Sequence, residues 1–191
     1  MTERSRSRGE RADAARNRAK VLEAAAELFA GKDPRAVTMD EVARAAGIGR
    51  ATLYRRYPDI ASIAEALLDE HERRLQEELL RGGPPLGPGA PPGERLAAFY
   101  AAMAGLLERH AHLVLGAETG RARFAAGAYG FWRAHVLALL REGGASAPEA
   151  LADPLLAPLA PDVFTHQREQ GLSTAEIASA LAHLARRVLP E

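Results

Sequence analysis

Cationic and hydroxyl side chains cluster in the segment GIGRATLYRRYPD, residues 47–59 of this 191-residue sequence. Arg50, Tyr54, Arg55 and Arg56 are close enough for one short helix to present them over two turns. Guanidinium and phenol groups donate hydrogen bonds to anions, and arginine also pairs with the acceptor atoms of guanine. The segment therefore has the chemistry of a polyanion-binding surface, provided that its neighbours hold it outward.

The residues before and within this segment predict a helix, a tight turn and a second, short helix. Thr38 and Glu41 have the spacing of a capping box, in which each side chain satisfies a free backbone N–H of the other residue. Gly47 is expected to end this helix, and Gly49 to let the chain leave the turn without a steric penalty. Pro58 stops the next helix, because the residue before a proline is disfavoured in helical geometry.

This arrangement is a helix-turn-helix, whose second helix is short enough to enter the major groove of DNA. Helical spacing separates an inward set of side chains from an outward set. The inward set is Val42, Ala46, Ile48, Leu53 and Tyr57, and the outward set is Arg50, Thr52, Tyr54, Arg55 and Arg56.

The rest of the chain also has helical periodicity and no alternating strand pattern, which predicts an all-α fold of about nine helices. We expect a disordered, arginine-containing arm at 1–13, either a solvated tail or an arm that seeks a DNA groove. A helix-turn-helix domain at 14–58 and a helical domain at 59–191 follow. Residues 82–93 hold ten glycines and prolines, which predicts a flexible loop and the clearest internal boundary. The segment 124–140 is apolar on almost all sides and is expected to be buried all round, either in a core or against a partner chain.

Composition excludes several other classes of protein. The chain has no cysteine, so it has no disulfide framework, thiolate metal site or thiol nucleophile. No apolar run is long enough to span a membrane, so a cytoplasmic protein is expected. Residues 1–60 carry 13 Lys/Arg against 9 Asp/Glu, whereas the net charge of the chain is zero. The positive excess of the first part fits a polyanion partner.

The run TMDEVARAAGIGRATLYRRYPD, preceded by VLEAAAELFAGKDPRAV, resembles the N-terminal domain of the tetracycline-repressor (TetR) family of transcriptional regulators. The resemblance covers residues 16–68. It implies a DNA-reading second helix, with the remaining helices forming a ligand pocket and a dimer interface. It also implies a homodimer that binds a pseudo-palindromic double-stranded operator, and a small apolar effector.

The resemblance assigns a role to each matching residue. Thr38 is similar to a phosphate contact at a helix start, and Arg50 and Thr52 occupy positions that the family uses in the groove. Tyr54 resembles a tyrosine that reaches a backbone phosphate. Arg55 and Arg56 are expected to contact phosphate in preference to bases.

One position departs from the family pattern. After the proline, the family often has a small residue and then a lysine that contacts phosphate, whereas this chain has Asp59 and Ile60. Asp59 is a good N-cap residue, but its charge would lie close to a phosphate. Either DNA binding is weaker here, or the two arginines at 55–56 and the N-terminal arm compensate.

The C-terminal part holds aromatic and apolar side chains that suit either a plain core or a ligand pocket. We expect the dimer to be sealed by two helices of each subunit, at 159–170 and 173–189. His135 is interpreted as a buried core histidine or as a polar anchor for the ligand. The pocket candidates are Phe99, Tyr100, Met103, Leu107, Phe124, Phe131, Trp132 and His135.

The sequence gives little support for a metal site or for catalysis. His110 and His112 are two residues apart, so they do not share a helix face and make a poor metal pair. No nucleophile–base set or phosphate loop is recognisable, so neither an enzyme nor a cofactor or metal is expected. Two rivals remain: a regulator-like, small-molecule-binding protein with weakened or lost DNA binding, and a helical enzyme or carrier that merely contains the motif.

Overall fold

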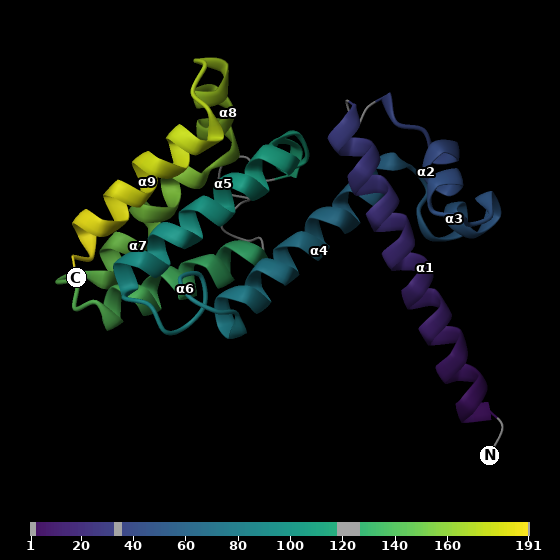
Figure 1. Ribbon diagram of the computed structural model, residues 1–191, viewed down its shortest axis with the longest axis horizontal. Coiled ribbons are helices and arrows are strands. Elements are labelled where there is room, and N and C mark those ends of the chain that lie inside the picture. The colour runs from purple at the N-terminus through teal and green to yellow at the C-terminus, as the bar shows by residue number, and fades with distance from the viewer. Residues whose placement is uncertain (1–2, 33–35, 118–126, 191) are drawn as a thin grey trace. The chain divides into compact units, whose positions relative to one another are not determined.

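The computed structural model describes residues 3–32, 36–117 and 127–190. This part of the chain is all-α and contains no strand, as the sequence predicts (Figure 1). Nine α-helices and one short 3-10 helix follow one another in it: α1 Glu3–Gly31, α2 Met39–Ala45, α3 Arg50–Arg56, α4 Ile60–Arg81, α5 Pro92–Ala117, α6 Gly127–Glu142, α7 Pro148–Leu156, η3 Ala157–Leu159, α8 Pro161–Glu169 and α9 Thr174–Val188.

The chain packs as two units, residues 1–70 and 71–191, and the division falls inside α4. The sequence placed the boundary after Pro58 instead. The first turns of α4 remain with the first unit because Ile63 is fully buried in its core. Val21 and Ala25 of α1, Val42 of α2 and Leu53 of α3 belong to the same core.

Helix α1 is longer than the sequence predicted. The expected arm at 1–13 lacks large apolar residues, yet the helix begins at Glu3, so residues 3–13 continue it. Hydrophobic periodicity starts only at Val21 and cannot report on this stretch. Arg, Glu and Ala are good helix formers, and extending an existing helix needs no new nucleus. Met1 and Thr2 of the predicted arm lie outside the described residues.

The turn between α2 and α3 depends on one glycine. Gly47 has φ +64°, a left-handed conformation that side chains with a Cβ rarely adopt. Gly49, by contrast, has φ −67°, and a Cβ there would meet only the Thr52 hydroxyl oxygen at 3.9 Å. The expectation that Gly49 is needed for its conformational freedom is therefore wrong, and Gly47 alone has this role.

In the second unit, α5 is the central helix. Leu96, Phe99 and Tyr100 are each fully buried along it. Helix α9 packs along α5, α8 also contacts α5, and α7 packs on α6 (Figure 1). A second capping box, formed by Ser173 and Glu176, begins α9.

Residues 82–91 connect α4 to α5 without a helix, as the glycines and prolines predict. The segment is nevertheless packed in place. Gly87 is buried, and its N–H donates to the Gly83 carbonyl at 2.9 Å. A Cβ on Gly87 would collide with the Gly82 carbonyl, so close backbone packing requires this glycine. The sequence therefore predicted the break in helix but not the packing that fixes it.

Within this chain, helix α6 is not buried all round, so the alternative of a helix enclosed by the core is wrong, while burial against a partner chain stays a prediction. Trp132, Val136 and Leu139 face the core, whereas Ala134 and Ala138 are exposed. Alanines count as apolar in a sequence pattern, but their small surface costs little to leave in water. The start of the predicted apolar segment, at 124–126, lies outside the described residues.

Candidate nucleic-acid interface

The two helices of the motif are held by a shared apolar floor. Val42 and Ala46 from the α2 side, together with Leu53 and Tyr57 from the α3 side, are buried as predicted. Ile48, in the turn, is only half-buried. Because the inward side chains fix α3 against the core, the rest of this seven-residue helix is presented to solvent.

The outward set has the predicted exposure with one exception. Arg50, Tyr54, Arg55 and Arg56 are all exposed, and Tyr54 retains 46% of its accessible surface despite its large ring. Thr52 is half-buried. Exposed guanidinium groups beside an exposed phenol form a donor-rich surface that suits phosphate and base-edge acceptors.

Thr38 caps α2, as predicted from its spacing to Glu41. Its hydroxyl donates to a Glu41 carboxylate oxygen at 2.8 Å, and its backbone N–H donates to the same oxygen at 2.8 Å. The Glu41 N–H donates back to the hydroxyl at 3.3 Å. The donor proton of Thr38 is therefore used inside the protein, and a phosphate contact requires it to turn away from Glu41.

Glu41 is a fixed negative charge at the start of α2. The Lys32 ammonium donates to its carboxylate at 2.6 Å, and this hydrogen bond is the main cause that lowers the pKa of Glu41 to about 2. The backbone N–H and hydroxyl of Thr38 lower it further. Glu41 thus remains ionised across the physiological pH range, and Lys32 compensates its charge.

Arg50 does not stand alone on the surface. Its guanidinium lies 2.7 Å from a carboxylate oxygen of Asp40, across the turn between α3 and α2. Both side chains are well exposed, so the pair is a surface ion pair, although the Asp40 oxygen that faces the guanidinium is covered and the contact does not have hydrogen-bond geometry. Arg50 must exchange this partner before it can contact DNA, a restraint that the sequence spacing did not reveal.

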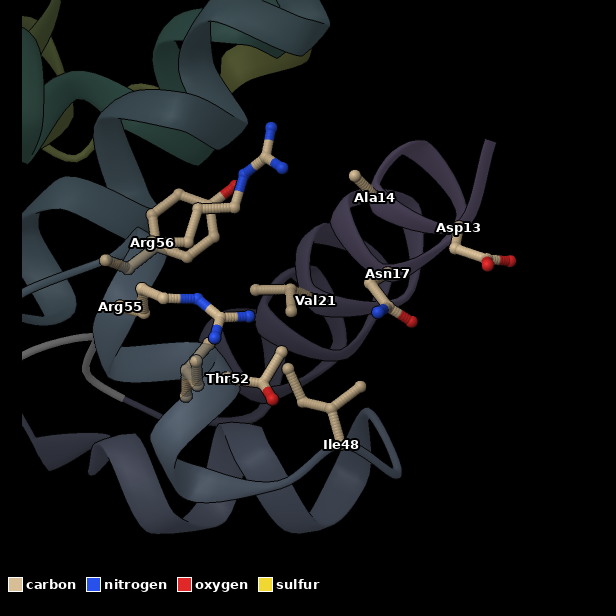
Figure 2. Close-up of a pocket in the computed structure, with 10 residues that line it drawn as sticks. Asp13, Ala14, Asn17, Val21, Ile48, Thr52, Arg55 and Arg56 are labelled. Carbon is tan, nitrogen blue, oxygen red and sulfur yellow. The ribbon is translucent and has the colours of Figure 1, made fainter. Parts of the chain in front are cut away.

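A groove between α1 and α3 lies beside the outward set and was not predicted. It has a volume of about 440 Å³. Figure 2 shows Arg55 reaching from α3 toward α1, where Asn17 and Val21 lie. The sequence pattern gave no signal for Asn17. The residues around the groove are Asp13, Ala14, Asn17, Val21, Ile48, Thr52, Leu53, Arg55, Arg56 and Tyr57.

The departure at the start of α4 has a structural role. The Asp59 carboxylate accepts from the Ser62 N–H at 2.8 Å, and the Ser62 hydroxyl donates to the Asp59 carbonyl at 2.7 Å. Asp59 therefore caps α4, as predicted. Ile60 is half-buried against the core of the first unit, so it supplies no phosphate-binding group.

The predicted pocket residues lie in the second unit, where most of them are buried. Phe99 contacts Trp132 and His135 with ring centroids 5.9 and 5.4 Å apart. Phe131 is half-buried and Phe124 lies outside the described residues. The other five predicted residues are also buried: Tyr100, Met103, Leu107, Trp132 and His135.

Two polar groups in this cluster differ in how they are satisfied. The Tyr100 hydroxyl donates to the Leu155 carbonyl at 2.8 Å, and burial raises its pKa. Burial, assisted by the charge of Arg95, lowers the pKa of His135 to about 4, so this histidine is neutral. Its Nε2 atom is buried and has no hydrogen-bond partner among the described residues.

The histidine pair considered from the sequence is not the pair that forms. His110 is buried, and its Nε2 lies 2.7 Å from Nδ1 of His71 on α4. The side chain of His112 is not described. Across the described residues, no three His, Asp or Glu side chains gather as metal ligands. His71 and His110 come together because α4 lies against α5, a contact that spacing within either helix does not show.

Taken together, a capped α2, a glycine turn and an arginine-rich α3 on a buried floor define a helix-turn-helix protein. Residues 21–67 match the family described as bacterial regulatory proteins, tetR family, so this part of the chain is a DNA-binding domain of that family.

Similar proteins agree with this assignment. An uncharacterized HTH-type transcriptional regulator of Mycobacterium tuberculosis is 39% identical over 61 residues, which are 32% of this chain and 30% of that protein. The matched part therefore spans about a third of the curated relative. The solved structure of a TetR-family transcriptional regulator from Rhodococcus sp. has a TM-score of 0.62 at 18% identity, over 92% of this chain and 99% of that one. The SmeT–triclosan complex has a TM-score of 0.57 at 14% identity, over 90% of each chain.

None of the described helices has the length and apolar character needed to cross a membrane.

Proposed function

We propose that this protein is a DNA-binding transcriptional regulator that binds a pseudo-palindromic operator as a homodimer and acts as a ligand-responsive repressor. One observation carries the proposal. Helix α3 packs its inner face against the core and exposes Tyr54, Arg55 and Arg56 to solvent. The match of residues 21–67 to a family of bacterial regulatory proteins supports it. Each α3 would enter a major groove, and the two grooves would be about one helical turn, roughly 34–36 Å, apart or somewhat more.

The proposed contacts divide by chemistry. Tyr54 and Arg56 are expected at phosphates, which position the protein without reading sequence. Arg50 and Thr52 begin α3 and are the candidates for base edges, where a good bidentate arginine–guanine pair discriminates by about 1–3 kcal/mol. Arg55 faces the α1–α3 groove and is expected at phosphate. Thr38 is retained as a phosphate contact, subject to the release of its hydroxyl from Glu41.

A dimer interface built from α8 and α9 is supported by exposed apolar side chains on these helices and in the turn between them. Val163, Leu172 and Leu184 are among the few large apolar residues that are more than a third exposed in the described chain. Ala180, one turn before Leu184 on α9, is exposed as well. An apolar surface of this kind on paired helices fits a self-complementary contact with a second copy.

An effector site in the second unit is supported by the aromatic cluster around Phe99 and by the unpartnered Nε2 of His135. The proposed effector is a small, mainly apolar molecule, with His135 as its polar anchor. SmeT, a protein of this fold, has been solved in complex with triclosan. Effector binding would release DNA only if it favours one arrangement of the two units over the other, with α4 as the shared element.

The test is a binding titration on the DNA upstream of the protein's own gene, followed by fluorescence anisotropy at several salt concentrations. The double variant Tyr54→Ala/Arg55→Ala is expected to fold normally and to lose operator binding. Arg81→Ala, which changes an exposed arginine at the end of α4, is the matched control and should bind like the wild type. Binding of the double variant at wild-type strength would show that the proposed contacts are wrong.

The second candidate is a regulator-like protein with weakened or lost DNA binding, and Asp59 and Ile60 favour it. They place a carboxylate and a half-buried apolar side chain where the family resemblance leads one to expect a phosphate-binding lysine. Steep salt dependence of wild-type binding to a defined duplex would exclude it, because that dependence reports phosphate contacts.

A further inference from the structure

The α1–α3 groove joins a helix outside the helix-turn-helix to the proposed reading helix. Four of its residues come from the middle of α1: Asp13, Ala14, Asn17 and Val21. Its volume is in the range of ligand clefts, about 300–1,000 Å³, so it accepts a bulky group rather than a single ion.

The groove has an apolar floor and a polar rim. Val21 and Leu53 are buried beneath it, while Arg55 and Arg56 are exposed at its α3 side. Asn17 is half-buried on the α1 side and supplies a neutral amide. A backbone of sugars and phosphates matches this division, because its sugars are less polar than its charged phosphates.

The hydroxyl of Tyr57 adds an unused hydrogen-bonding group. Tyr57 is 5% exposed, lines the groove, and its hydroxyl has no partner in the part of the chain that the structure describes. Leaving a buried hydroxyl without a partner costs about 1–3 kcal/mol. An acceptor that entered the groove, directly or through a water, would recover part of this cost.

We propose that the α1–α3 groove seats one DNA strand, with Asn17 and Arg55 holding a phosphodiester between α1 and α3. This inference rests on the proposed function and adds α1 to the DNA-contacting surface. The seat continues the proposed interface without a break, since Thr52, Arg55 and Arg56 belong to both. It also supplies a phosphate site that Asp59 and Ile60 do not.

Asp13 sets the charge balance of this seat. Its carboxylate is paired with the Arg16 guanidinium on the same exposed face of α1. A phosphate arriving beside Asn17 would meet this carboxylate one turn away, so Asp13 opposes binding while Arg16 favours it. Exchanging carboxylate for amide at position 13 and amide for carboxylate at position 17 keeps the shape of each side chain. If the groove holds a phosphate, the first change should raise DNA affinity and the second should lower it.

The experiment measures the affinity of the full-length chain for a duplex that the wild type has selected from a randomised pool. Asn17→Asp, which keeps the side-chain shape, is expected to weaken binding about tenfold at low salt, because it places a like charge against phosphate. Asp13→Asn is expected to strengthen binding. Glu23→Gln is the matched control on the same helix, since Glu23 is exposed and does not line the groove, and it should change affinity less than either.

A set of duplexes with single neutral methylphosphonates identifies the contacted phosphate. At one position the neutral linkage should abolish most of the penalty of Asn17→Asp, and at all others the penalty should persist. A loss of affinity that is equal at every position, or that matches the effect of Glu23→Gln, would refute the proposed phosphate site. The effect of Asn17→Asp would then come only from long-range electrostatics. If the wild type binds no selected duplex at all, the proposed function itself fails, and the two failures are thus distinguishable.

Discussion

The ion pair between Asp40 and Arg50 provides the sharpest prediction about DNA affinity. The pair is close, at 2.7 Å, but the arginine and aspartate side chains are 68% and 42% exposed. Pairs of this kind contribute about 0–1 kcal/mol, because water and salt screen them. Arg50 therefore gives up at most about 1 kcal/mol when it turns to DNA, which corresponds to about fivefold in the DNA affinity of each helix-turn-helix domain.

Asp40→Asn removes this competition and a negative charge from the proposed interface. We expect DNA affinity to rise by up to about fivefold for each helix-turn-helix domain. The slope of log K against log salt concentration should steepen by up to about 0.9 for each domain, as for one added phosphate contact. Stability should change by less than about 1 kcal/mol. The assay is anisotropy on the selected duplex at four or more salt concentrations, with chemical denaturation as the folding control.

The opposite outcome is equally clear. If Asp40→Asn weakens binding and relaxes preference at one base position, Asp40 orients Arg50 toward that base instead of competing with DNA. The reasoning from competition would then be refuted. Glu27→Gln is the control, because it removes an exposed negative charge on α1 outside the groove. Its effect shows how much of any rise in DNA affinity comes only from the change in net charge.

Three further predictions follow from the described contacts. Tyr57→Phe removes a buried hydroxyl that has no described partner, so the free energy of unfolding should stay level or rise by about 1 kcal/mol, and a loss of stability would mean that the hydroxyl is satisfied. The folded pKa of His135, about 4, lies below its ordinary value, so the free energy of unfolding of the wild type should keep its full value above about pH 6.5 and fall as the pH drops from about 6.5 toward 4. His135→Leu should flatten this part of the pH profile of the melting temperature. Leu184→Glu should shift sedimentation from dimer to monomer with an unchanged circular dichroism spectrum, whereas Glu169→Gln on α8 should leave the assembly intact, and a dimeric Leu184→Glu would place the interface elsewhere.

Local chemistry made much of the first unit predictable from the sequence. The capping box at Thr38 and the Asp59 cap each depend on residues within a few positions of one another. The buried floor of the motif was predictable as well, because helical spacing alone separates the two faces of α3. These features need no knowledge of the rest of the chain.

The features that the sequence did not show depend on contacts between elements. The Asp40–Arg50 pair joins two helices through a turn, and the α1–α3 groove joins residues about 40 positions apart. His71 meets His110 only because α4 packs on α5. Hydrophobic periodicity reports which face of a helix is buried but not which partner it meets, so such pairs remain open until the packing is known.

The early start of α1 has an electrostatic consequence. Arg4, Arg6 and Arg8 occupy its first turns, and the free N–H groups of a helix give that end a partial positive charge. Cations at this pole oppose the helix dipole, so this stretch is helical in spite of its own charge pattern. A passing polyanion would neutralise both the arginines and the pole. The first turns of α1 should therefore gain helix stability as ionic strength or bound phosphate rises, which would make this end of the protein respond to the nearness of DNA before any base is read.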